Sequence, residues 1–130
     1  MRNKFIIIGS FFALTATIAG ALGAHALKNI IPPSSLESFK TGVEYQMYHA
    51  IALIFTGILM YQNDKKKIRW VGYFFIAGIF FFSGSIYALS TSRVTGIDFS
   101  FLGPVTPIGG LLFMTGWILI IFNFIKNKNE

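Results

Sequence analysis

Four long apolar runs, separated by short polar segments, are the main feature of the chain. They span residues 5–27, 45–61, 68–89 and 107–125. Each is close to the ~20 residues that an α-helix needs to cross about 30 Å of hydrocarbon. The runs are continuous, whereas the strands of a membrane β-barrel alternate apolar and polar residues. The pattern therefore predicts four transmembrane helices.

The second run is short, and its helix is expected to begin earlier. Ser34-Ser35-Leu36-Glu37, directly after two prolines, has the S-x-x-E form of a capping box. Apolar residues then recur at helical spacing, so this segment either lies on the membrane surface or runs straight into the second helix. We predict one membrane domain, residues 1–130, with helices at about 5–27, 35–62 (including an interfacial start), 68–90 and 107–125.

The composition agrees with a membrane protein. Apolar residues make up 54% of the chain and charged residues only 12%, against roughly 25% charged in an ordinary globular domain. A soluble protein of 130 residues is mostly surface and could not cover it with so few charges. In hydrocarbon every backbone N–H and C=O group must be paired within the protein. We therefore expect an all-α fold, an integral membrane four-helix bundle.

The net charge of +6 does not indicate a nucleic-acid partner. Lys and Arg flank the apolar runs instead of forming a patch, and in that position they determine orientation in the membrane. The chain has no cysteine, which excludes disulfides, thiolate metal sites and thiol catalysis. We expect membrane lipids as partners, no nucleic acid and no metal site.

The distribution of Lys and Arg predicts the orientation. Eight of them lie at the termini and around the second connection, and three lie around the first and third connections. Because cytoplasmic segments carry the excess of basic residues, we expect a plasma membrane protein with both termini in the cytoplasm (N-in/C-in). The eight are Arg2, Lys4, Lys65, Lys66, Lys67, Arg69, Lys126 and Lys128, and the three are Lys28, Lys40 and Arg93.

The first run also has features of a secretory signal. It follows Arg2 and Lys4 and ends near Ala24-His25-Ala26, which has the A-x-A form of a cleavage site. The apolar stretch before that site is too long for an ordinary signal peptide. We therefore expect a retained helix.

Polar residues gather at the helix ends that this topology puts on the outer side. Polar side chains in lipid are costly and face the bundle interior or a cavity, so we predict a polar binding site in the outer-leaflet half. Thr106 and Pro107 would cap and open the fourth helix there. The predicted site residues are His25, Glu44, Tyr45, Gln46, Tyr48, His49, Ser83, Ser85, Tyr87 and Thr106.

Each of these residues also has a purely structural interpretation. An interfacial histidine is usually hydrogen-bonded to a neighbouring group, and the tyrosines suit an aromatic belt. Two histidines at similar depth, His25 and His49, would also suit haem ligation. His49 with Glu44 would suit acid–base chemistry on a lipid. The sequence assigns no catalytic residue and does not identify a cofactor.

Small residues predict close helix packing. Gly9, Ala13, Ala16, Gly20 and Ala24 form one stripe on the first helix, and small residues let another backbone approach in lipid. Glycines of the third and fourth helices suit the same role. They are Gly72, Gly78, Gly84, Gly109, Gly110 and Gly116.

Four ordered motifs carry a family resemblance. They are GALGAHAL at residues 20–27, YQMYHA at 45–50, FSGSIY at 82–87, and TPIGG at 106–110 followed by Gly116-Trp117. The chain resembles the small four-span membrane family catalogued as domain of unknown function 423, which has bacterial members and relatives in animals. The resemblance covers nearly the whole chain. It implies a four-span membrane protein and brings no biochemical activity with it.

The sequence favours a non-catalytic function. We expect the protein to bind a lipid or small amphiphile in the outer-leaflet polar site, or to act as an accessory subunit of a larger membrane complex or homo-oligomer. The alternative is a lipid-modifying enzyme that uses His25, His49 and Glu44. A haem-binding membrane protein is the third hypothesis.

Overall fold

The computed structural model describes residues 2–62 and 66–127, which form helices joined by short connections with no strand among them. Four helical segments are long and apolar enough to cross a membrane, which confirms the predicted all-α, four-helix membrane fold. In chain order the elements are α1 (Arg2–His25), α2 (Pro33–Gln62), α3 (Lys66–Gly78), the π-helix η1 (Ile79–Gly84), α4 (Ser85–Ser90), α5 (Ser92–Thr95), the 3₁₀ helix η2 (Ser100–Leu102) and α6 (Val105–Asn127).

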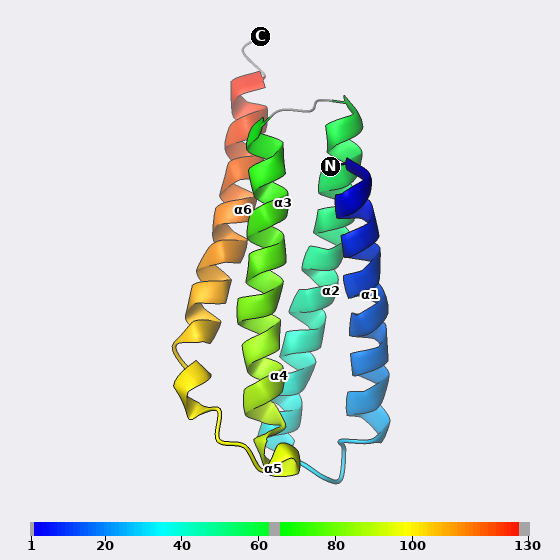
Figure 1. Ribbon diagram of the computed structural model, residues 1–130, viewed down its shortest axis with the longest axis vertical. Coiled ribbons are helices and arrows are strands. Elements are labelled where there is room, and N and C mark those ends of the chain that lie inside the picture. The colour runs from blue at the N-terminus through cyan, green and yellow to red at the C-terminus, as the bar shows by residue number, and fades with distance from the viewer. Residues whose placement is uncertain (1, 63–65, 128–130) are drawn as a thin grey trace.

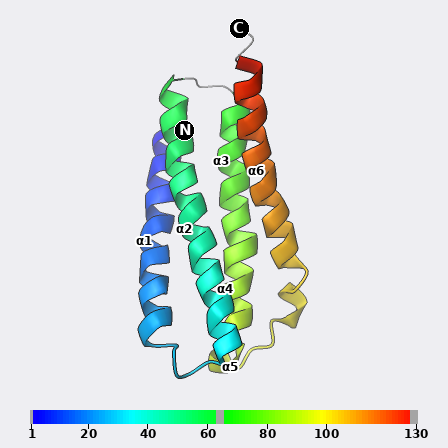
Figure 2. The same cartoon turned by 180° about the vertical axis from the view of Figure 1, so that it is seen from behind.

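The helices pack as two antiparallel pairs that meet through α2. α1 packs along α2, and α6 packs along α3 and η1, while α2 also contacts α3, η1 and α4. Both views place α1 and α6 at opposite sides of the bundle (Figures 1 and 2). α1 begins and α6 ends at the same end. We call the other end, at the bottom of Figure 1, the distal end; residues 26–32 and 91–104 form its connections.

The second helix is continuous from Pro33 to Gln62, so residues 34–43 extend it instead of lying apart on the membrane. The helix begins one residue before Ser34. The capping-box prediction is therefore wrong: a proline opens the helix, where its missing N–H has no partner to lose. The backbone N–H of Leu36 donates to the carbonyl of Pro32 at 3.0 Å.

The first and last helices also differ from their predicted bounds. α1 ends at His25 because the chain turns there, and Leu27 folds back with Ile31 onto Phe39 of α2. α6 begins at Val105, so Thr106 lies inside its first turn instead of capping it. Lys65 and Lys128, which contribute to the orientation prediction, lie outside the described residues.

The distal connection between α4 and α6 carries a charged residue. The backbone N–H of Ser100 donates to the Asp98 carboxylate at 3.0 Å. This hydrogen bond lowers the pKa of the Asp98 carboxyl group below its ordinary value, because it favours the ionised form. The carboxylate is fully exposed at this end of the bundle.

Aromatic rings fill the space beside glycines in the core. A Cβ atom on Gly72 would lie 2.3 Å from the Phe5 ring, and one on Gly78 would lie 2.4 Å from the Phe113 ring. A Cβ atom on Gly109 would lie 2.3 Å from the backbone nitrogen of Phe82. These glycines permit close packing, as predicted for small residues in membrane helices.

Gly84 does not follow this pattern. A Cβ atom there would meet nothing within 4 Å, and its φ of −60° and ψ of −46° suit any residue. Neither packing nor backbone conformation therefore requires a glycine at this position.

The two kinds of glycine predict opposite effects of one substitution. Gly109→Ala should lower the free energy of unfolding by about 1–3 kcal/mol, because the new methyl group overlaps backbone that cannot move away. Gly84→Ala should leave stability unchanged or slightly raised. Thermal unfolding of both variants in detergent tests this. Equal melting temperatures would contradict the helix contact at Gly109.

Candidate functional site

Gln46 is the centre of a hydrogen-bond network between α1, α2 and α4. Its Nε2 atom donates to the carbonyl of Phe12 at 2.9 Å and to the hydroxyl of Thr15 at 2.7 Å. Its Oε1 atom accepts from the Tyr87 hydroxyl at 2.6 Å. The side chain is only 5% exposed. A single amide therefore joins three helices.

The network lies near the middle of the bundle's length. Thr15 lies near the midpoint of α1 (Arg2–His25), so the network lies well inside the bundle. The two neighbours in the predicted set differ in burial: Gln46 is buried, whereas Tyr45 is 38% exposed and packs its ring against Phe82.

The third span, Lys66–Ser90, consists of α3, η1 and α4. Two of its serines connect it to neighbouring helices at and just after the π-helix. The Ser83 hydroxyl donates to the carbonyl of Gly42 in α2 at 2.7 Å. The hydroxyls of Ser85 and Thr106 lie 2.6 Å apart and link α4 to the first turn of α6. A π-helix places residues out of the usual α-helical register and is frequent at functional sites.

His49 is buried and both of its ring nitrogens are used. Nδ1 lies 2.7 Å from the carbonyl of Tyr45, and Nε2 accepts from the indole N–H of Trp117 at 3.0 Å. A carbonyl only accepts and an indole only donates, which fixes a neutral ring with its proton on Nδ1. The ring also stacks on Phe113 with centroids 3.5 Å apart. No nitrogen is left for haem iron or for acid–base chemistry.

His25, Glu44 and Tyr48 lie outside these networks. His25 is exposed at the distal end of α1, beyond Gly23, which faces Phe39. Ten residues of α2, or ~15 Å along its axis, separate Phe39 from His49. The predicted similar depth of the two histidines is therefore wrong.

The charged and aromatic members of the predicted set are also dispersed. Glu44 is exposed and lines a surface pocket of about 520 Å³ with Lys40 and Glu37, and Tyr48 is 55% exposed. The structure therefore does not assemble the His25, His49 and Glu44 constellation of the enzyme hypothesis. Among the described residues, no group of three or more His, Asp or Glu side chains could hold a metal ion.

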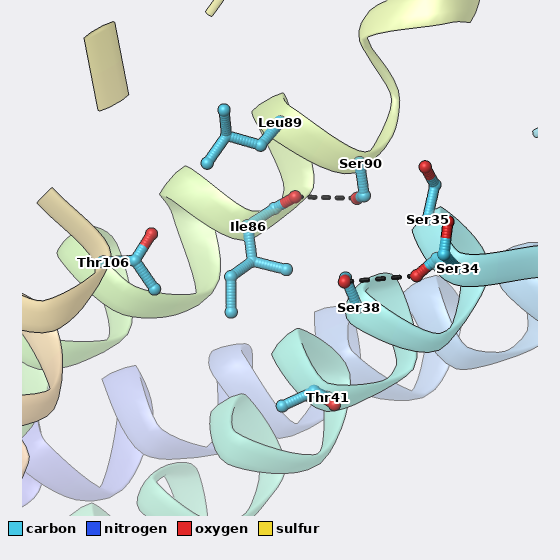
Figure 3. A pocket seen from close by; sticks show the side chains of 8 residues that line it. All are labelled: Ser34, Ser35, Ser38, Thr41, Ile86, Leu89, Ser90 and Thr106. Atoms are coloured by element: carbon cyan, nitrogen blue, oxygen red, sulfur yellow. Dashed lines mark hydrogen bonds between the residues drawn. The ribbon is translucent and has the colours of Figure 1, made fainter. Parts of the chain in front are cut away.

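A groove near the distal end brings together six hydroxyl groups. It has a volume of about 440 Å³ and lies between the first turns of α2, the end of the third span and the start of α6. Figure 3 shows three serines and one threonine of α2 on one side of it, and Ile86, Leu89 and Ser90 of α4 on the other. We call it the hydroxyl groove. Its lining residues are Ser34, Ser35, Ser38, Thr41, Ile86, Leu89, Ser90 and Thr106.

Of the residues predicted for the site, only Thr106 lines the hydroxyl groove. The serines and threonine that α2 contributes were missed, although a signal was present in the sequence. Ser34, Ser38 and Thr41 recur at spacings of four and three, which places them on one face of a helix. The capping-box interpretation concerned only the start of the helix and did not identify this shared face.

Comparison with known proteins identifies the family. A model of the family described as "Protein of unknown function (DUF423)" matches residues 19–110. The chain belongs to the DUF423 family. This match confirms the resemblance that the four motifs indicated. The matched residues include Gln46, Ser83, Ser85, Tyr87 and Thr106.

The relatives extend the match over nearly the whole chain. A UPF0382 membrane protein of Bacillus subtilis is 40% identical, with 94% of this chain and 96% of the relative covered. One from Staphylococcus aureus is 39% identical, covering 94% and 95%, and one from Haemophilus influenzae is 35% identical, covering 99% of each. No solved structure matches the chain. The DUF423 chain is thus a membrane protein of a family of unknown function.

The network around Gln46 predicts a specific loss of stability. Gln46→Leu keeps the size of the side chain but leaves the Tyr87 hydroxyl without an acceptor and removes the donor to the Phe12 carbonyl and the Thr15 hydroxyl. We expect the free energy of unfolding to fall by about 1–3 kcal/mol. The matched control is Gln62→Leu, at the exposed end of the same helix. Thermal unfolding in detergent should separate the two variants, and equal melting temperatures would count against the network.

Proposed function

We propose that this protein binds a membrane lipid or a small amphiphile, and that it holds the polar end of that molecule in the hydroxyl groove. The observation that carries the proposal is the gathering of six hydroxyl groups from three helices around one groove. Its volume, about 440 Å³, falls within the range of roughly 300–1,000 Å³ for ligand pockets. Polar side chains in membrane helices usually line such a site or pack against each other.

The lining favours an uncharged polar group with an apolar neighbour. Serine and threonine hydroxyls both donate and accept hydrogen bonds, and none of the lining residues carries a charge. Ile86 and Leu89 form the apolar part of the wall. Glycerol, ester and amide groups of lipids fit this combination of hydrogen bonding and hydrocarbon contact.

The groove's hydroxyls can be released to a ligand at small cost. The hydroxyls of Ser38 and Thr41 donate to carbonyls of their own helix at 3.2 Å, and that of Ser90 does the same at 2.7 Å. These bonds satisfy the hydroxyls when the groove holds no ligand. Rotation about one side-chain bond turns each hydroxyl toward a bound polar group.

The proposed orientation places the hydroxyl groove on the outer side of the plasma membrane. Lys and Arg are more frequent near the end of the bundle where α1 begins than near the distal end, and basic residues mark the cytoplasmic side. Under this orientation the distal end, with its groove, faces the outer leaflet and both termini face the cytoplasm.

Filling the groove should prevent lipid retention. Thr41→Leu removes one hydroxyl and inserts a larger apolar side chain into the groove. Thr17→Leu is the matched control, because Thr17 also donates to a carbonyl four residues earlier, at 2.9 Å, but lies on the exposed face of α1. Native mass spectrometry of the purified protein should show a bound lipid in wild type and Thr17→Leu, reduced at least about tenfold in Thr41→Leu.

Two results would overturn this proposal. One is equal lipid retention in the two threonine variants. The other is a wild-type protein that carries no lipid and co-purifies in mild detergent with another membrane protein, which would support the accessory-subunit function instead.

The natural absence of cysteine makes the orientation testable with single-cysteine variants. Asn29→Cys lies in the connection between α1 and α2, and Gln62→Cys lies at the opposite end of the bundle; both positions are exposed. A membrane-impermeant maleimide on intact cells should label Asn29→Cys, and should label Gln62→Cys only after permeabilisation. The reverse pattern would invert the orientation.

A further inference from the structure

A second groove opens between α1 and the third span, on the other side of the contact between α2 and α4. It has a volume of about 310 Å³. Most of its wall is apolar, from Phe12 and Ala19 of α1 and Ile79 and Phe80 of η1, and its polar residues are those of the Gln46 network. Gly84 completes the lining. We call it the lateral groove.

Gly84 keeps this groove open. Packing and backbone conformation do not require a glycine there, and a glycine within a helix is less favourable than alanine by about 1 kcal/mol. Gly84 lines the groove and is exposed, and a Cβ atom there would meet nothing within 4 Å. A larger side chain at this position therefore has room to occupy part of the groove.

The neighbouring groups determine which atoms of the Gln46 network donate hydrogen bonds and which accept them. Nε2 must face the carbonyl of Phe12, because the opposite orientation of the amide would place two carbonyl oxygens together. Oε1 then faces Tyr87, so the phenol must donate. The Thr15 hydroxyl donates to the Phe12 carbonyl at 3.1 Å and accepts from Nε2.

All side-chain donors of the network are therefore used, whereas acceptors remain. Among the residues that the structure describes, none donates a hydrogen bond to the Tyr87 oxygen, and Oε1 of Gln46 has a second lone pair. Hydrocarbon cannot donate to either atom. A molecule that enters the lateral groove gains a hydrogen bond here only if it brings a donor.

We infer that the lateral groove binds an uncharged lipid alcohol, with its chain along the apolar wall and its hydroxyl donating to Tyr87 or Gln46. Such a molecule supplies the donor that the network lacks and avoids the cost of placing a charge within the bilayer. An ester or ether lipid of the same length supplies acceptors only. The inference does not depend on the hydroxyl groove, which uses other residues.

Two probes with the same chain test the need for a donor. 1-Hexadecanol and hexadecyl methyl ether differ in the hydroxyl proton and one methyl group. Wild-type protein in detergent should bind the alcohol about fivefold more tightly than the ether, the effect of one ordinary hydrogen bond. Native mass spectrometry at matched concentrations measures the ratio. Equal binding of the two probes, or binding of neither, would overturn the inference.

Substitution at Gly84 tests the location. Gly84→Leu should reduce retention of hexadecanol at least about tenfold, whereas Ala21→Leu, which places the same side chain on the exposed surface of α1, should have no effect. Unchanged alcohol binding in Gly84→Leu would contradict the assignment. Thr41→Leu, which fills the hydroxyl groove, should leave hexadecanol binding intact, so failure of one site is distinguishable from failure of the other.

Discussion

The structure depends on the constraint that a polar group inside a membrane protein must be paired within the protein. Gln46 meets it by bonding to three helices at once. Among the described residues, no buried side-chain nitrogen or oxygen atom lacks a partner. In lipid the hydrophobic effect does not drive helices together, so packing and interhelical hydrogen bonds hold the bundle. The Gln46 network therefore determines how α1, α2 and α4 fit together.

The same constraint explains why the two grooves lie where they do. The contact between α2 and α4, where Gly42 faces Ile86 and Tyr87, separates the hydroxyl groove from the lateral groove. Ile86 and Tyr87 follow each other in α4, about 100° apart around the helix axis, so Ile86 lines one groove and Tyr87 the other. A polar network that is needed for packing thus also supplies polar lining for ligands.

The sequence predicted the fold well because hydrophobicity and length alone determine membrane spans. It predicted the site only in part. Ser83, Ser85, Tyr87 and Thr106 do connect helices, but sequence cannot show which partner satisfies a histidine, and His49 is paired by Trp117 from a helix far along the chain. Gly84 was assigned to packing because nothing in a sequence distinguishes a glycine facing a helix from one facing a groove.

An experimental structure of the protein purified in lipid nanodiscs would test the account most directly. It should show ordered, elongated density in the hydroxyl groove, with its polar end against the hydroxyls of α2 and α4. A groove closed by direct contact of these helices, or one that holds only water, would contradict the proposed function.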